Sequence, residues 1–240
     1  MALPKMILFD YGETLIHEDG FDGVAGNDAL LQYAVKNADH LNGKQIQCFA
    51  QKLQQDSLGH VRALNLESHN RIFEHFLFEY LGIEFSLTPL ETEIVFWNAA
   101  APGRPMPGIE NTLALLDKKG IRTGVISNIS FSGEALAERI NRLLPENHFE
   151  FILASSEYLF RKPCPYLFEL ALRKANLCAS DVWFCGDNAQ ADVAGAAAVG
   201  IRPVWFTAPF ECAYRTEGAN QTPVCRYDRI VHWSELSLLL

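Results

Sequence analysis

The sequence predicts an α/β protein with a doubly wound, mainly parallel sheet and an all-helical segment inserted after the first strand. Short apolar runs alternate with amphipathic, helix-like stretches from about residue 109 to the end of the chain. Several of these apolar runs end in a polar side chain beside a turn residue. Residues 27–98, in contrast, carry only helical periodicity.

The composition is that of an ordinary soluble globular protein, with 49 % hydrophobic and 20 % charged residues among 240. The net charge of −9 argues against a nucleic-acid partner, because binding to a phosphate backbone requires a basic surface. No apolar run approaches the roughly 20 residues of a membrane-spanning helix. The first five residues run directly into a strand, so we expect no secretory signal and no membrane partner.

The cysteines are scattered and show no paired zinc-type spacing. In a chain of this size they are expected to be free thiols in a reducing compartment, which predicts a cytoplasmic protein. The six are Cys48, Cys164, Cys178, Cys185, Cys212 and Cys225.

The first strand is expected at residues 6–9, where four apolar residues are too few for a helix. It stops at Asp10, followed by Gly12 and, four residues after the acid, by Thr14. Ligands bind at the carboxyl ends of strands in an open parallel sheet, so Asp10 is a candidate nucleophile or metal ligand. Glu13 is interpreted as a solvated turn residue.

Residues 17–25 contain two glycines and three acids and are expected to form a flexible flap. Helical spacing then predicts helices near 28–35, 46–53, 72–80 and 89–98. The last begins with a capping box, Thr88 to Glu91, with proline at its first position. Three prolines and two glycines in residues 99–108 predict a linker without regular structure.

The rest of the chain alternates between helix and strand. The helices are expected at 109–119, 132–144, 166–176, 191–199 and 234–240, the strands at 124–127, 149–154, 182–187, 201–206 and 230–231, and a long loop at 207–226.

Polar groups stand at the ends of these strands or just before helices. Ser127 and Asn128 end one strand, Lys162 precedes a helix that starts with proline, and Asp187 ends another strand with Asp192 five residues later. If the strands are neighbours, one crevice collects carboxylates, a hydroxyl, an amide and an ammonium group.

This ordered set resembles the haloacid dehalogenase superfamily of hydrolases, most of which are phosphatases, over nearly the whole chain. Asp10 with Thr14 matches its first motif, Ser127 the second, Lys162 the third, and Asp187 with Asp192 the fourth. The resemblance implies a Rossmann-like core of residues 1–16 and 99–240. It also implies that residues 17–98 are a helical cap domain, the part that selects the substrate in this family.

The resemblance also implies a mechanism on a small phosphorylated molecule. Asp10 would attack phosphorus and form an aspartyl-phosphate, while Ser127, Asn128 and Lys162 hold the transferring oxygens. All candidate metal ligands at this site are oxygen atoms, which are the ligands that Mg²⁺ prefers. Its implied ligands are Asp10, the backbone carbonyl of Gly12, Asp187 and Asp192.

Gly12 departs from the family's phosphatases, which place a second aspartate there as general acid and base. Such a group contributes on the order of a hundred- to ten-thousand-fold to the rate. His17, expected on a surface loop, Glu13, water or a good leaving group could take over its task. Two alternatives stay open: carbon–halogen cleavage, against which the intact Asp187 and Asp192 speak, and a phosphate-binding or regulatory protein with weakened turnover.

Overall fold

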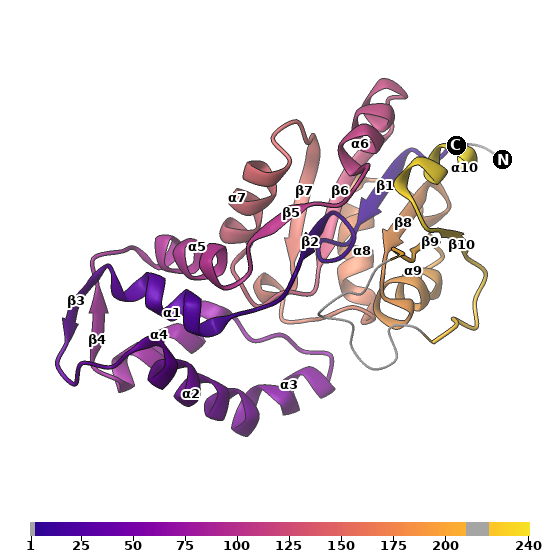
Figure 1. Cartoon of the computed structure of the whole chain (residues 1–240). Coiled ribbons are helices and arrows are strands. Elements are labelled where there is room, and N and C mark those ends of the chain that lie inside the picture. Colours follow the sequence, from indigo (N-terminus) through magenta and orange to yellow (C-terminus); the bar gives the residue numbers. More distant parts are fainter. Residues whose placement is uncertain (1–2, 210–220) are drawn as a thin grey trace.

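The chain folds around a six-stranded sheet in the order β10-β9-β8-β1-β6-β7, with all neighbours parallel. A computed structural model describes residues 3–209 and 221–240 (Figure 1). The sheet lies at one end of the molecule with helices on both sides. Its strands are β1 (Met6–Phe9), β6 (Arg122–Ser127), β7 (Phe149–Ala154), β8 (Val182–Gly186), β9 (Arg202–Phe206) and β10 (Asp228–Ile230).

Helices cover both faces of this sheet, which confirms the predicted doubly wound α/β fold. Ile7 and Phe9 of β1 pack with α6 (Ile109–Lys118), α7 (Gly133–Leu143) and α10 (Leu236–Leu239). Met6 and Leu8 point to the other face, towards α8 (Pro165–Ala175) and α9 (Gly195–Ala198). Because β1 is buried on both faces, it shows no alternation of apolar and polar residues.

The segment between β1 and β6 is mostly helical and lies to one side of the sheet (Figure 1). We call residues 23–100 the helical lobe. The predicted capping box is present, since Thr88 Oγ1 accepts from the amide of Glu91 at 3.3 Å and Glu91 Oε2 accepts from the amide of Thr88 at 2.8 Å. The lobe's helices are α1 (Gly23–Leu31), α2 (Gly43–Leu53), α3 (Gly59–Ala63), α4 (Asn70–Tyr80) and α5 (Pro89–Ala100), with a π-helical turn at Gln54–Leu58.

The expectation of helices alone in this segment is wrong. Strands β3 (Ala34–Asn37) and β4 (Ile83–Phe85) form an antiparallel pair at the far end of the lobe. The expected helix at 28–35 therefore ends at Leu31, and Val35 is exposed instead of packed.

Both linkers between the sheet and the lobe also contain a strand. β2 (Ile16–Glu18) pairs antiparallel with β5 (Gly103–Pro105), so the beginning of the expected flap and the expected irregular linker form a two-stranded ribbon. Pro105 can occupy β5 because an edge strand does not need every amide for pairing.

Towards the C-terminus the expected elements are present, but the type of two helices differs from the prediction. The helix expected at 191–199 is a π-helical turn, Ala189–Ala194, followed by the short α9. The terminal helix is a 3₁₀ turn, Trp233–Glu235, followed by α10. Most of the expected loop at 207–226 lies outside the described residues.

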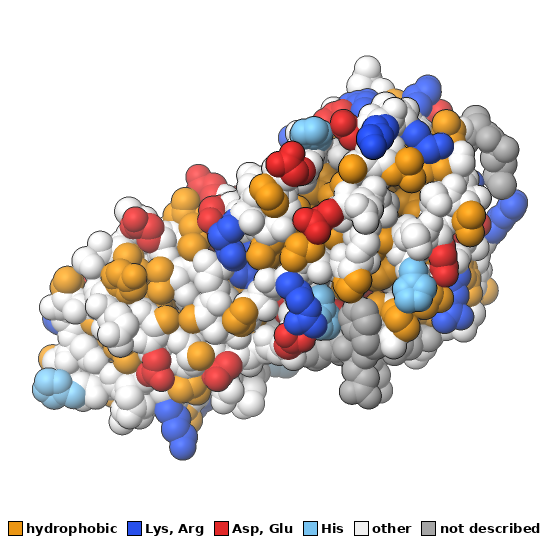
Figure 2. All heavy atoms as spheres, turned by 45° about the horizontal axis from the view of Figure 1, so that its top comes forward, with side chains coloured by type: hydrophobic (Ala, Val, Ile, Leu, Met, Phe, Trp, Pro, Cys, Tyr) orange, Lys and Arg blue, Asp and Glu red, His pale blue; other side chains and the backbone are white. Residues whose placement is uncertain are grey.

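The charged surface and the helices bear on the expected absence of nucleic-acid and membrane partners. On the face that Figure 2 shows, acidic and basic side chains are interspersed, and the described residues form no continuous basic surface there. Within the described parts of the chain, no helix is both long and apolar enough to cross a membrane.

Candidate active site

The structure brings together all seven residues predicted for the site. They line one cavity of about 660 Å³ at the carboxyl ends of the strands. The residues are Asp10, Gly12, Ser127, Asn128, Lys162, Asp187 and Asp192.

Strand order explains why these distant residues meet. β1 lies between β6 and β8, and Phe9 is in register with Val125 on one side and Cys185 on the other. The residues just beyond these positions, Asp10, Ser127 and Asp187, therefore emerge at the same edge of the sheet. This is where open α/β sheets bind ligands.

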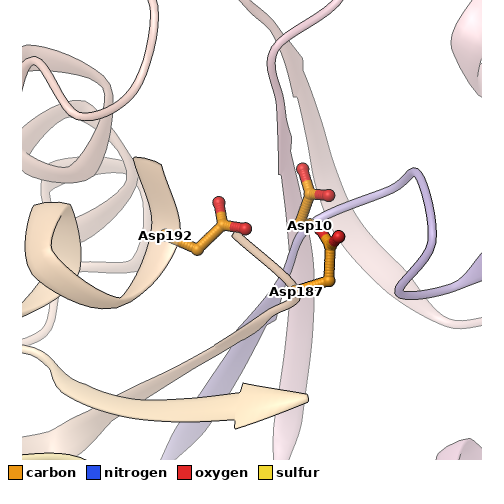
Figure 3. A group of neighbouring side chains, drawn as sticks. All are labelled: Asp10, Asp187 and Asp192. Carbon is orange, nitrogen blue, oxygen red and sulfur yellow. The ribbon is translucent and has the colours of Figure 1, made fainter. Parts of the chain in front are cut away.

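Three buried carboxylates form the acidic centre of the site. Figure 3 shows Asp10 after β1, Asp187 after β8, and Asp192 on the following helical turn, directed towards the other two. Each offers an oxygen, and these three oxygens lie within 4.8 Å of one another.

Lys162 is buried against two of these acids. Its Nζ lies 2.6 Å from Asp10 Oδ1 and 2.7 Å from Asp192 Oδ1, and it donates to the carbonyl of Ile126 at 2.8 Å. Burial disfavours the ammonium charge, but the two carboxylates outweigh it and raise the pKa of Lys162. The lysine therefore remains a cation.

The acidity of Asp10 reflects the same crowding. Burial raises the pKa of Asp10 to about 6; Lys162 opposes this effect, and the negative charge of Asp192 adds to it. Three carboxylates beside one ammonium leave an excess of two negative charges in a site shielded from water.

These residues fit a divalent cation of the Mg²⁺ type. The donors are all oxygens, which Mg²⁺ prefers. The two excess negative charges of the buried cluster would be balanced by the two positive charges of such an ion. The ion would thereby relieve the repulsion between the three carboxylates.

Asn128 holds the backbone of Lys162 in place. Its side-chain amide donates to the carbonyl of Lys162 at 2.9 Å and accepts from the Lys162 amide at 2.7 Å. The end of β6 and the loop before α8 are thus joined through backbone atoms of Lys162. This contact is additional to the predicted role of Asn128 in substrate binding, which stays a prediction.

The two residues considered as substitutes for the missing acid–base group are not on the surface. Glu13 was interpreted as solvated and His17 as a loop histidine; both are buried. His17 Nδ1 lies 2.7 Å from Glu13 Oε2, and His17 Nε2 lies 3.1 Å from Asp19 Oδ1. The β2–β5 ribbon causes this burial, because it folds the segment after Asp10 back against the core.

The cavity continues between the helices of the lobe, where no site residue was predicted. Asn27, Asn70 and Glu74 line this part together with Phe73 and Leu77. A polar residue on the buried face of an amphipathic helix, as Glu74 is on α4, is the one signal that could have indicated it.

The cysteines agree with the expectation of free thiols as far as the structure describes them. Cys48, Cys164, Cys178, Cys185 and Cys225 are unbridged. Cys212 lies outside the described residues.

Comparison with known proteins gives a match over most of the chain. The model of the haloacid dehalogenase-like hydrolase family matches residues 4–200. Glyceraldehyde 3-phosphate phosphatase of Pyrococcus furiosus is 34 % identical over 105 residues, which cover 43 % of this chain and 42 % of that protein. The protein of the same name from Methanothermobacter thermautotrophicus is 28 % identical over 203 residues, 83 % of this chain and 84 % of that one.

Solved structures show the same fold. A 2-haloacid dehalogenase from Pseudomonas syringae superposes with a TM-score of 0.64 at 22 % identity, covering 99 % of this chain and 98 % of its own. At this identity the likeness concerns the fold. The chain spans less than half the length of the Pyrococcus relative, so that protein's activity does not transfer by comparison alone.

Proposed function

Because the chain belongs to the haloacid dehalogenase-like hydrolase family, we propose that it is a Mg²⁺-dependent phosphatase acting on a small phosphorylated molecule. The observation that carries this proposal is the buried cluster of Asp10, Asp187 and Asp192 around Lys162 at the strand ends. Relatives named as phosphatases support the reaction class. The free thiols of the described cysteines support a cytoplasmic location.

Asp10, the backbone carbonyl of Gly12, Asp187 and Asp192 would hold the metal ion. When bound, Mg²⁺ supplies positive charge that offsets the carboxylates and polarises the phosphoryl oxygens. Gly12 can serve here because the proposed ligand is a backbone atom.

The covalent chemistry is assigned to Asp10. Its carboxylate oxygen attacks phosphorus while the bond from phosphorus to the leaving oxygen breaks, which forms an aspartyl-phosphate. Lys162 and Ser127, with Asn128 beside them, hold the transferring oxygens and balance their charge. Water then attacks phosphorus, releasing inorganic phosphate and restoring Asp10. The leaving oxygen takes its proton from a group other than residue 12, since glycine has none to give.

We further propose that residues 17–98 act as the cap and that residues 1–16 and 99–240 form the catalytic core. The shared cavity supports this division, because its wall combines the strand ends with residues from α1, α2 and α4. A leaving group on a phosphate held at Asp10 would extend towards those helices.

Asp10→Asn tests the proposal directly. We expect Mg²⁺-dependent phosphate release from a panel of phosphate monoesters by the wild type, loss of that release on chelation of the metal, and a fall of at least about a thousandfold in the variant, because an amide is a poor nucleophile. Release of halide from a 2-haloacid without metal would favour the dehalogenase alternative. Metal-dependent phosphate binding without turnover would favour the regulatory one.

Gly12→Asp tests whether the missing acid–base group limits the rate. A Cβ built at Gly12 meets no atom within 4 Å, so the backbone there accepts a side chain. We expect phosphatase activity to rise by at least about tenfold, while Gly12→Ala, the matched control without a carboxyl group, leaves it unchanged. An equal response to both substitutions would show that another group supplies the proton.

A further inference from the structure

Glu74 places a carboxyl group in the lobe part of the active-site cavity. It lies on α4, its exposed fraction is 8 %, and it lines the same cavity as Asp10. Leu77 and Phe78 of α4 and Ala50 of α2 supply apolar side chains to the lobe part of the cavity. Because Glu74 and the strand-end residues line one cavity, a leaving group that fills the lobe part of this cavity would meet Glu74.

Unlike Glu13 and Glu18, which line the same cavity, Glu74 has no ion-pair partner among the described residues. Glu13 contacts His17, and Glu18 lies 2.8 Å from the guanidinium of Arg139. Within residues 3–209 and 221–240, Glu74 forms no ion pair, which is unusual because buried acids are mostly paired with a cation.

The surroundings keep Glu74 uncharged. Burial raises its pKa to about 8; the nearby Asn70 side chain lowers it, Glu93 raises it further, and Arg71 lowers it. At neutral pH the carboxyl group therefore holds its proton and can both donate and accept a hydrogen bond.

Asn27 on α1 supplies a second polar group to this part of the cavity. Its side chain is 2 % exposed, and its Nδ2 donates to the carbonyl of Gly23 at 2.7 Å and to Gln47 Oε1 at 3.1 Å. Its Oδ1 receives no hydrogen bond from the described residues. A buried acceptor without a donor is unfavourable, and a hydroxyl group on a ligand would supply the missing hydrogen bond.

We infer that Glu74 and Asn27 recognise hydroxyl groups on the leaving group, so that the substrate is the phosphate monoester of an uncharged polyhydroxylated molecule. This inference rests on the proposed phosphatase function. A hydroxyl group can donate to Asn27 Oδ1 and accept from the protonated Glu74, whereas an ammonium group only donates and a second anion only accepts. The apolar wall suits the C–H groups of such a molecule.

The test compares three esters of similar size: glycerol 3-phosphate, propyl phosphate and 2-aminoethyl phosphate. We expect the wild type to prefer glycerol 3-phosphate over the other two by about tenfold to a hundredfold in kcat/KM, as two hydrogen bonds allow. Glu74→Leu should abolish this preference, and Glu74→Gln, which still donates and accepts, should retain most of it. Glu79→Gln, on the exposed side of the same helix, is the matched control and should keep the full preference.

Asn27→Ala tests the second residue through the same ratio of kcat/KM values and should also reduce the preference for glycerol 3-phosphate. This variant keeps the test decisive if Glu74→Leu does not fold. Equal rates with all three esters, or a preference for 2-aminoethyl phosphate, would overturn the inference and leave the phosphatase proposal intact. If the wild type hydrolyses none of the esters, the proposed function itself fails.

Discussion

Gly186 shows how little space separates the strand ends from the residues that follow them. A Cβ at this position would lie 2.4 Å from Asp192 Cγ, so Asp192 would have to move. Asp192 cannot move aside without losing contacts, because its carboxylate lies 2.7 Å from Lys162 Nζ and accepts from the amide of Asn188 at 2.9 Å. Glycine at the end of β8 is therefore required for the acidic cluster to form.

Gly186→Ala is expected to lower the free energy of unfolding by about 1–3 kcal/mol through overpacking and to remove most activity by displacing Asp192. Gly20→Ala is the control, since an added Cβ there meets no atom within 4 Å. Urea unfolding together with phosphate release checks both effects. Wild-type activity in Gly186→Ala would show that Asp192 can shift without loss of function.

The charge state of Glu74 predicts a pH dependence of stability. Its pKa is about 8 in the folded chain and ordinarily about 4.5, so the folded state holds the proton more tightly. This contribution is complete below about pH 4.5 and is lost as the pH rises through about 8. Relative to Glu74→Gln, which carries no charge at any pH, the wild type should therefore lose a few kcal/mol of unfolding free energy between pH 5 and pH 8.5.

Urea unfolding of both proteins at the two pH values measures this difference. Taking the difference removes the effect of other titrating groups, such as Asp10, that the two proteins share. An unchanged difference between wild type and variant would mean that Glu74 is already ionised at pH 5 and that a cation, Arg71 for instance, compensates it.

At the scale of elements, the strands of the sheet and the residues at their ends could be predicted, but the small ribbons could not. The central strands β1 and β8 are continuous apolar runs, as expected of strands buried on both faces. The ribbon strands have three or four residues, too few for a periodic pattern, and their partners lie far away in the sequence. The β2–β5 ribbon nevertheless shapes the surroundings of the site, because it buries Glu13 and His17.

Arg139 is another feature that the sequence hides. Its place on an amphipathic helix suggests a solvated charge, yet it is 1 % exposed. It donates to Tyr11 Oη at 2.6 Å and to Glu18 at 2.8 Å, and its guanidinium lies 4.5 Å from the ring centre of Trp97. α7 thereby holds both connections to the lobe, an arrangement that depends on tertiary contacts and not on any local pattern.

In the whole molecule, the lobe is attached to the sheet by more than its two linkers. The amide of Asn70 donates to the carbonyl of Ser130 at 2.8 Å, and the amide of Arg161 donates to the carbonyl of Asn65 at 2.8 Å. These contacts bind the segment before α4 to the loops that carry Asn128 and Lys162. The sequence predicted the lobe and the site separately; the cavity between them depends on this docking.

Glu93 of α5 is at the centre of a third contact between lobe and sheet. It is fully buried, accepts from the amide of Ser132 at 2.9 Å and from its hydroxyl at 2.5 Å, and pairs with Arg71 Nε at 2.9 Å. One carboxylate thus joins α4 and α5 of the lobe to the N-terminus of α7, which follows the loop after β6.

Glu93→Gln is expected to weaken this contact and to lower the free energy of unfolding by about 2–3 kcal/mol, because hydrogen bonds to a charged group are lost in a buried site. Hydrogen exchange should accelerate at residues 64–70 and 128–133 while β1 and β8 stay protected. Glu134→Gln is the control, since Glu134 also binds Arg71 but is exposed. Uniform acceleration of exchange across the sheet would mean that Glu93 stabilises the whole fold. Acceleration confined to the two loops, together with a higher KM, would show that docking of the lobe closes the cavity around the leaving group.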